Sequence, residues 1–219
     1  MCFSPIISLI TAIIEFVVAG YILINYRTKT SKFWAIFIIV LGIYQLTEFL
    51  MCYFGPVFAR LGFVTYTILP VLGLHFFIIL SRKKLSPIIF YIPWVIFSII
   101  ALFAPNFVIS ESCTLIFENI RTLFFNFQEN VIFTIIYLSY YFGFIFITSL
   151  IAFNCIKKEK DKKIKKTYSL AILAVMISLI AALILIIIFP TLGIMFPSIY
   201  CEFAIVSTIF AIIVVRQEK

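Results

Sequence analysis

Charge is scarce in this sequence. Asp, Glu, Lys and Arg make up 12% of the 219 residues, about half the share typical of soluble domains, and 64% of the residues are hydrophobic. The mean hydropathy is +1.22. These values exclude an ordinary soluble domain. They predict an all-α, polytopic protein of the cell membrane, built as a single transmembrane domain over residues 1–219 with no soluble domain.

Catalytic and cofactor motifs are equally scarce. The sequence contains one histidine, no HExxH motif, no P-loop and no Gly-x-Ser motif. A single histidine cannot supply a multi-histidine zinc site, and the five cysteines show no CxxC pair. No predicted span contains a lysine, which excludes a retinal Schiff base of the opsin type. We therefore expect no enzymatic activity, and the sequence identifies no cofactor.

Long apolar runs are what the chain does contain, and they predict seven transmembrane helices. The segment 33–54, FWAIFIIVLGIYQLTEFLMCYF, is long enough to cross a bilayer. The first run is too long for a signal peptide and is expected to remain as a helix. Pro70 is expected to kink the third span. The predicted spans are 5–26, 33–54, 57–80, 87–104, 131–154, 167–189 and 195–215.

The distribution of Lys and Arg predicts the orientation. Apart from Arg60 and Arg121, every basic residue lies in the connections 27–32, 82–84 and 157–166 or after residue 215. The positive-inside rule then places the N-terminus outside and the C-terminus in the cytoplasm, which requires an odd number of spans. Basic residues confined to short connections argue against a nucleic-acid partner and for membrane lipids as partners. The segment 157–166 acts either as a topology determinant or as a docking site for a cytoplasmic partner.

The predicted outer connection 105–130 differs from the inner ones. It carries Glu111, Glu118 and Glu129 against one basic residue, Arg121. We expect it to fold partly onto the outer mouth of the bundle, with its Phe and Leu residues at the membrane interface. The predicted topology permits a disulfide between Cys52 in the second span and Cys113 in this connection.

Polar residues inside the spans are the strongest functional signal. A carboxylate in the hydrocarbon region costs several kcal/mol or more, so Glu15, Glu48 and Glu202 are expected to face the protein interior. Helical spacing places each of two polar series on one helix face. These series are Ser4, Ser8, Thr11 and Glu15 in the first span, and Thr134, Tyr137, Tyr141 and Thr148 in the fifth.

These residues predict a polar pocket in the outer half of the bundle. Aromatic faces beside carboxylates suit a small organic cation or a metal ion, whose identity the sequence leaves open. The alternative is structural: Glu48 pairs with Arg60 in a buried salt bridge, and the Ser and Thr residues join helices. The candidate ligand-binding residues are Glu15, Gln45, Glu48, Arg60, Tyr66, Tyr137, Tyr141 and Glu202.

Two resemblances accompany this interpretation. Met1-Cys2-Phe3-Ser4 and Gln45-Leu46-Thr47-Glu48 resemble an uncharacterised family of prokaryotic multi-pass membrane proteins, whose members begin Met-Cys-(Phe/Tyr)-Ser and carry Gln-x-x-Glu in the second helix. In that pattern a small residue and a tryptophan follow the Glu, whereas Phe49 follows here. The segment 60–80, RLGFVTYTILPVLGLHFFIIL, is similar to the third helix of the seven-helix sensor domain of membrane histidine kinases. This second resemblance implies a sensor that signals to a separate partner.

Three functions remain open at this point. The leading interpretation is a small-ligand receptor or sensor with a pocket that opens to the outside. The second is a carrier or channel-like protein that moves a cation or a proton past Glu15 and Glu48. The third is a structural or assembly subunit.

Overall fold

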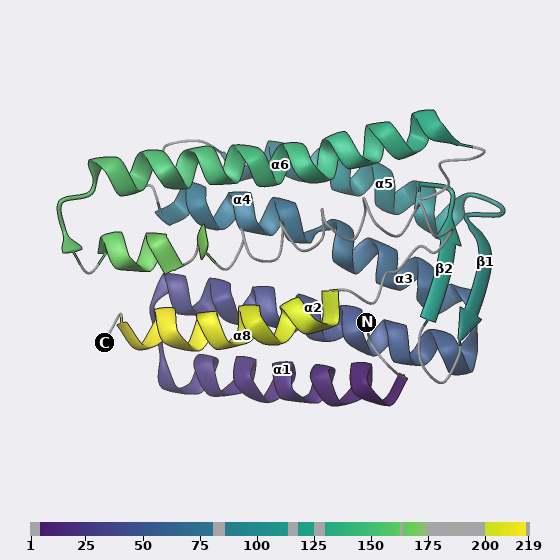
Figure 1. Cartoon of the computed structure of the whole chain (residues 1–219), viewed down its shortest axis with the longest axis horizontal. Helices are drawn as coiled ribbons and strands as arrows, with labels where there is room; N and C mark the ends of the chain where they lie inside the picture. Colours follow the sequence, from purple (N-terminus) through teal and green to yellow (C-terminus); the bar gives the residue numbers. More distant parts are fainter. Residues whose placement is uncertain are drawn as a thin grey trace.

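Long helices lying side by side make up most of the structure, a computed structural model that describes residues 5–80, 86–113, 118–124, 130–162, 164–170, 172–173 and 200–217 (Figure 1). Residues 164–170 are helical. Strands β1 (Val108–Cys113) and β2 (Glu118–Thr122) lie between α5 and α6. The helices are α1 (Pro5–Asn25), α2 (Lys29–Phe54), α3 (Pro56–Thr67), α4 (Leu69–Leu80), the 3-10 helix η1 (Pro87–Tyr91), α5 (Ile92–Phe103), α6 (Val131–Lys158) and α8 (Tyr200–Gln217).

Helix α2 is central and contacts α1, α3, α4 and α8. It begins at an N-cap, where the Thr28 side chain accepts a 3.0 Å hydrogen bond from Ser31 N. It ends at Gly55, whose φ of 82° lies in the left-handed region that favours glycine. Helix α3 begins at Pro56, directly after this glycine, so the chain reverses its direction at Gly55 alone. The helices α1, α2 and α3 therefore form two tight antiparallel pairs.

Four described helices are long and apolar enough to cross a membrane: Pro5–Asn25, Lys29–Phe54, Pro56–Ile79 and Val131–Lys158. They correspond to the first, second, third and fifth predicted spans. The segments Pro87–Phe103 and Ala204–Arg216 are apolar helices that are shorter. Most of the sixth predicted span, 167–189, lies outside the described residues. The prediction of an all-α fold is thus confirmed for the described residues, and the length and composition of these helices are compatible with a membrane protein.

The third predicted span is broken where Pro70 was expected to kink it. Helix α3 ends at Thr67 and α4 begins at Leu69. Proline has no N–H, so a helix cannot pass it with all its hydrogen bonds intact. At the break, Tyr140 of α6 donates a 2.7 Å hydrogen bond to the Thr67 carbonyl. The hydroxyl groups of Thr67 and Tyr137 also lie 3.0 Å apart. Two tyrosines of α6 thus hydrogen-bond with a single residue at the break.

The connection between α5 and α6 forms an antiparallel hairpin, which hydropathy did not predict. Leu123 N donates to Phe107 O at 2.9 Å and closes its base. A disulfide joins Cys113 of β1 to Cys52 of α2. The prediction that the phenylalanines of this connection lie at the membrane interface is wrong for Phe107 and Phe124, which are 0% and 1% exposed and pack into the bundle. The hairpin is therefore anchored to the bundle by a covalent bond and two aromatic side chains.

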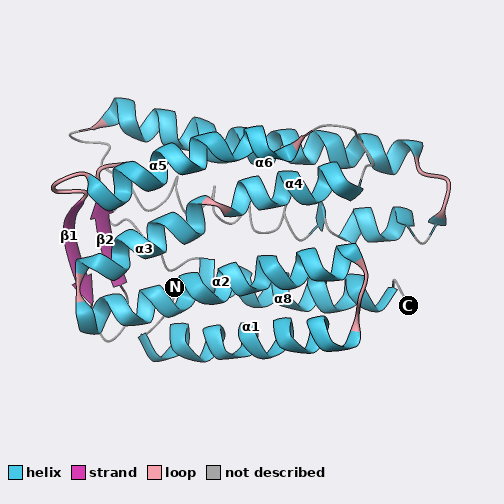
Figure 2. Ribbon diagram, turned by 180° about the vertical axis from the view of Figure 1, so that it is seen from behind, coloured by secondary structure: helices cyan, strands magenta, loops and turns pink. Residues whose placement is uncertain are grey.

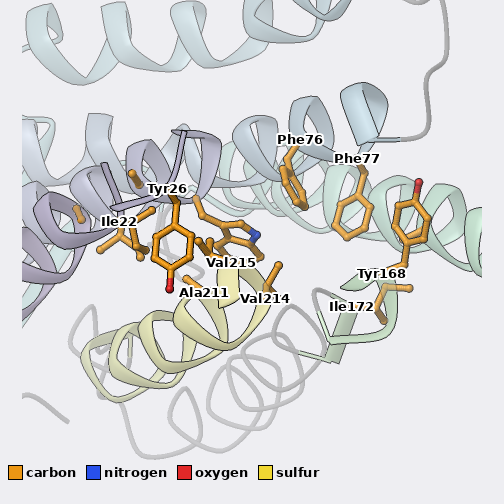
Figure 3. Packing of buried hydrophobic residues seen from close by; sticks show 14 residues of the cluster. Ile22, Tyr26, Phe76, Phe77, Tyr168, Ile172, Ala211, Val214 and Val215 are labelled. Atoms are coloured by element: carbon orange, nitrogen blue, oxygen red, sulfur yellow. The ribbon is translucent and has the colours of Figure 1, made fainter. Parts of the chain in front are cut away.

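Two hydrophobic clusters fill the interior. Figure 3 shows the cluster in which Ile22 and Tyr26 lie near Ala211 and Val215 of α8, with Phe76 and Phe77 of α4 further along. The second cluster is rich in aromatic rings and lies among α2, α3, α5 and α6 and the residues that flank the hairpin. Large apolar side chains such as Ile24, Phe103 and Ile132 are more than 70% exposed. An exposed apolar surface of this kind suits contact with lipid.

Candidate functional site

The polar face of α1 is buried against α2, as its spacing predicted. Ser8, Thr11 and Glu15 are each 0–1% exposed. Ser8 Oγ donates to Glu48 Oε2 at 3.5 Å, which places the start of α1 beside the end of α2. Further along, Gly42 lets the Phe16 ring lie so close that an added Cβ would be 2.9 Å from it. These two contacts fix the register of the antiparallel pair.

Glu48 is a hydrogen-bonded carboxylate inside the bundle. It is 3% exposed and accepts hydrogen bonds from the hydroxyl groups of Tyr44 and Ser8, one at each oxygen. Burial disfavours the charged form of this carboxyl group, and the two hydrogen bonds oppose that effect, because hydrogen bonds donated to an ionised carboxylate are stronger than neutral ones. Tyr44 precedes Glu48 by one helical turn, and the sequence interpretation overlooked it although the four-residue spacing was visible.

Glu15 is in a different situation. It is 0% exposed, and among the residues that the structure describes neither carboxylate oxygen has a hydrogen-bond partner. The charge of Glu48 is near enough to act on it. Gln45, three residues before Glu48, is also fully buried. We call Glu15 and Glu48 the carboxylate pair.

Tyrosines from three helices form the other half of the site. Tyr66 of α3 has its ring centroid 5.9 Å from that of Tyr44, 6.1 Å from Tyr137 and 5.6 Å from Tyr141. We call these four residues the tyrosine cluster. The structure thus brings together Tyr66, Tyr137 and Tyr141, as predicted, and Tyr44 links them to Glu48 through its hydroxyl group. All four are less than 9% exposed.

Arg60 does not pair with Glu48 as the sequence suggested. The Arg60 guanidinium donates hydrogen bonds to the carbonyls of Ala101, Leu102 and Ala104 at 2.7, 3.2 and 3.0 Å, and it lies 5.7 Å from the Phe107 ring centroid. Cations are favoured at helix C-termini, where carbonyl groups lack partners within the helix. The structure forms no ion pair between the described side chains of Arg60 and Glu48, so the predicted salt bridge is wrong. Arg60 stabilises the end of α5.

Two further polar residues within the predicted spans are Glu202 and the single histidine, His75. The backbone of Glu202 belongs to α8, but its side chain is outside the described part of the structure. His75 Nδ1 lies 2.8 Å from the Tyr91 hydroxyl and is a hydrogen-bonded helix residue. In the described segments no group of three or more His, Cys, Asp or Glu side chains is placed to hold a metal ion.

Comparison of the chain with models of protein families, with curated proteins and with solved structures gives no match. Function therefore has to be inferred from the geometry of the carboxylate pair and the tyrosine cluster.

Proposed function

We propose that the protein is a seven-span membrane receptor or sensor for a small organic cation, with its N-terminus outside and its C-terminus in the cytoplasm. The orientation is supported by the arrangement of the ends. The hairpin lies at one end of the bundle, and the α1–α2 connection, the end of α6 and the end of α8 lie at the other (Figures 1 and 2). Arg27, Lys157, Lys158 and Arg216 belong to that second end. A basic end of this kind faces the cytoplasm by the positive-inside rule.

One observation carries the ligand class. Glu48 is buried, hydrogen-bonded to Tyr44, and continuous with the rings of Tyr66, Tyr137 and Tyr141. Aromatic faces attract a cation by about 0.5–2 kcal/mol or more when it is desolvated, and a carboxylate supplies the opposite charge. Arg60 does not neutralise Glu48, since its hydrogen bonds go to α5. This combination favours quaternary ammonium compounds and other amines over anions.

A thermal-shift screen tests this proposal. Purified protein in detergent is heated with quaternary ammonium compounds, primary amines, uncharged isosteres and small carboxylates. We expect the ammonium compounds to stabilise the wild type. Glu48→Gln should weaken their binding by at least tenfold, the factor that corresponds to about 1.4 kcal/mol. Glu159→Gln, which changes a carboxylate in the connection after α6, is the matched control and should respond like the wild type. Stabilisation by carboxylates alone would refute a cation site.

The orientation has its own test. Lys162 is exposed in the basic segment, so a cysteine placed there should be protected from an impermeant thiol reagent in intact cells. Cys2, Cys155 and Cys201 are replaced by Ser in the same variant, so that the introduced cysteine is the only thiol outside the Cys52–Cys113 disulfide. Labelling of Lys162→Cys from outside would invert the proposed topology.

A carrier is the second candidate, and Glu15 is the observation that favours it. A buried carboxyl group that has no hydrogen-bond partner among the described residues suits a residue that binds and releases an ion or a proton. Uptake of a labelled organic cation into proteoliposomes separates the two functions. A receptor binds the cation without net uptake, whereas a carrier accumulates it down an imposed gradient.

A further inference from the structure

Glu15 presents a chemical problem that the tyrosine cluster does not solve. Its side chain is completely buried, and its two oxygens lack hydrogen-bond partners in the described structure. An ionised carboxylate in such a place needs a counter-charge, and a protonated one would still leave its O–H group without an acceptor. The described basic side chains of these helices do not supply the charge. Arg60 donates its hydrogen bonds to carbonyl groups of α5. The lysines of α2 lie at the start of that helix, and the lysines of α6 lie in its last turn.

The register of α1 and α2 shows which oxygen-bearing side chains lie nearby. Ser8 is level with Glu48, and Phe16 is level with Gly42, so Thr11 and Gln45 lie at an intermediate level. Helical side chains lean toward the N-terminus of their helix. Glu15 therefore leans toward the level of Thr11, and Gln45, on the antiparallel helix, leans toward the level of Glu15. Thr11 and Gln45 are 1% and 0% exposed.

We propose that the Glu15 carboxylate binds a bare monovalent metal cation between α1 and α2, Na⁺ in preference to K⁺, with the Thr11 hydroxyl as a neighbouring oxygen ligand and Gln45 close by. Hydroxyl, amide and carboxylate oxygens are hard ligands and favour alkali and alkaline-earth ions over soft metals. The inference concerns the α1–α2 contact and goes beyond the proposed function, because it does not require an organic cation at the tyrosine cluster.

The charge and the size of the ion follow from the same contacts. Both oxygens of Glu48 already accept hydrogen bonds, so within the carboxylate pair it is Glu15 that has open oxygens in the described structure, and it contributes one negative charge of its own. Ca²⁺ needs about six to eight oxygen ligands, commonly from several carboxylates. The two Glu15 oxygens are buried and out of reach of water. Bare Na⁺ is smaller than a water molecule, whereas K⁺ is about as large, so Na⁺ enters with less separation of the helices.

Thermal unfolding in detergent at about pH 9, which offsets the cost of ionising a buried carboxyl group, tests the site. Chloride salts of Na⁺, K⁺, Ca²⁺ and N-methyl-D-glucamine are compared at constant ionic strength. A ligand that binds only the folded state stabilises it with the logarithm of its concentration above Kd. We therefore expect the unfolding midpoint of the wild type and of the control Glu159→Gln to rise with the logarithm of Na⁺ concentration, and to rise less with K⁺. In Glu15→Gln the rise that is specific to Na⁺ should disappear.

Several outcomes would overturn the proposal. Equal responses to Na⁺ and N-methyl-D-glucamine in the wild type would make Glu15 a packing residue. A retained Na⁺ response in Glu15→Gln would place the ion elsewhere, and a larger response to Ca²⁺ would exclude a monovalent site. If Glu15→Gln does not fold, saturable binding of radioactive Na⁺ to the wild type is expected, and its absence refutes the site. If only the proposed function is wrong, the Na⁺-specific rise is observed, but quaternary ammonium compounds tested at constant Na⁺ concentration do not bind.

Discussion

Gly62 offers a direct test of how closely α2 and α3 pack at the site. A Cβ added at Gly62 would lie 2.9 Å from Thr47 Oγ1 and 3.6 Å from Thr47 Cβ. Thr47 cannot easily move away, because its hydroxyl donates a 2.7 Å hydrogen bond to Tyr44 O and a β-branched side chain in a helix has few rotamers. Gly62→Ala should therefore push α3 away from α2 beside Tyr44.

The size of the effect can be worked from two opposing terms. Replacing a helical glycine by alanine gains about 1 kcal/mol of helix propensity. Inserting a methyl group into a closely packed contact costs about 1–3 kcal/mol. At Gly143 of α6 an added Cβ would meet nothing within 4 Å, so Gly143→Ala carries the first term alone. The unfolding free energies of the two variants should therefore differ by about 1–3 kcal/mol, which is the cost of the clash.

Denaturation by SDS in mixed micelles, followed by the fluorescence of the two tryptophans, measures this difference. Gly42→Ala should fall between the two variants, because the clash there is with the far end of the Phe16 ring, which can rotate. A Gly62→Ala protein as stable as Gly143→Ala would refute the described approach of α2 and α3, and with it the placement of Tyr44 beside Tyr66.

Three further predictions concern contacts around the site. Cys113→Ser should lower stability by about 2–4 kcal/mol, since the bond to Cys52 closes a long loop, and a reductant should destabilise the wild type but not the variant. Arg60→Gln and Glu48→Gln should each destabilise the folded protein. Their effects on the unfolding free energy should add within about 0.5 kcal/mol, because the two side chains do not meet. A larger coupling energy in the double-mutant cycle would contradict the structure. Tyr140→Phe should cost about 1–3 kcal/mol in the same SDS titration, because it leaves the carbonyl at the helix break without its hydroxyl donor. A neutral result would mean that another group satisfies that carbonyl.

Periodicity predicted the parts of the site that lie on single helices. The spacing of Ser8, Thr11 and Glu15 placed them on one buried face, and Tyr137 and Tyr141 proved to share a buried face of α6. Hydropathy located four long apolar helices, and Pro70 marked the break between α3 and α4. These signals are local, because they depend on residues within a few turns of one another.

The features that sequence reasoning missed depend on contacts between distant segments. Arg60 was matched to Glu48 by opposite charge, but the carbonyl groups at the end of α5, some forty residues later, offered it three acceptors. Hydropathy has no term for such backbone acceptors. The hairpin was missed because β1 and β2 are short, and its position depends on the Cys52–Cys113 bond and on burial of Phe107 and Phe124.

Helix α6 has a mechanical consequence for the bundle. Its 28 residues, at about 1.5 Å per residue, make an uninterrupted rod about 42 Å long. In its first half, Tyr137 and Tyr140 hydrogen-bond with Thr67 at the break between α3 and α4, and Lys157 and Lys158 lie in its last turn. An axial shift of the tyrosines is therefore carried through the rod to the basic end. A rigid rod would thus couple a change of angle at the break to a displacement of the two lysines, across about 26–32 Å of helix.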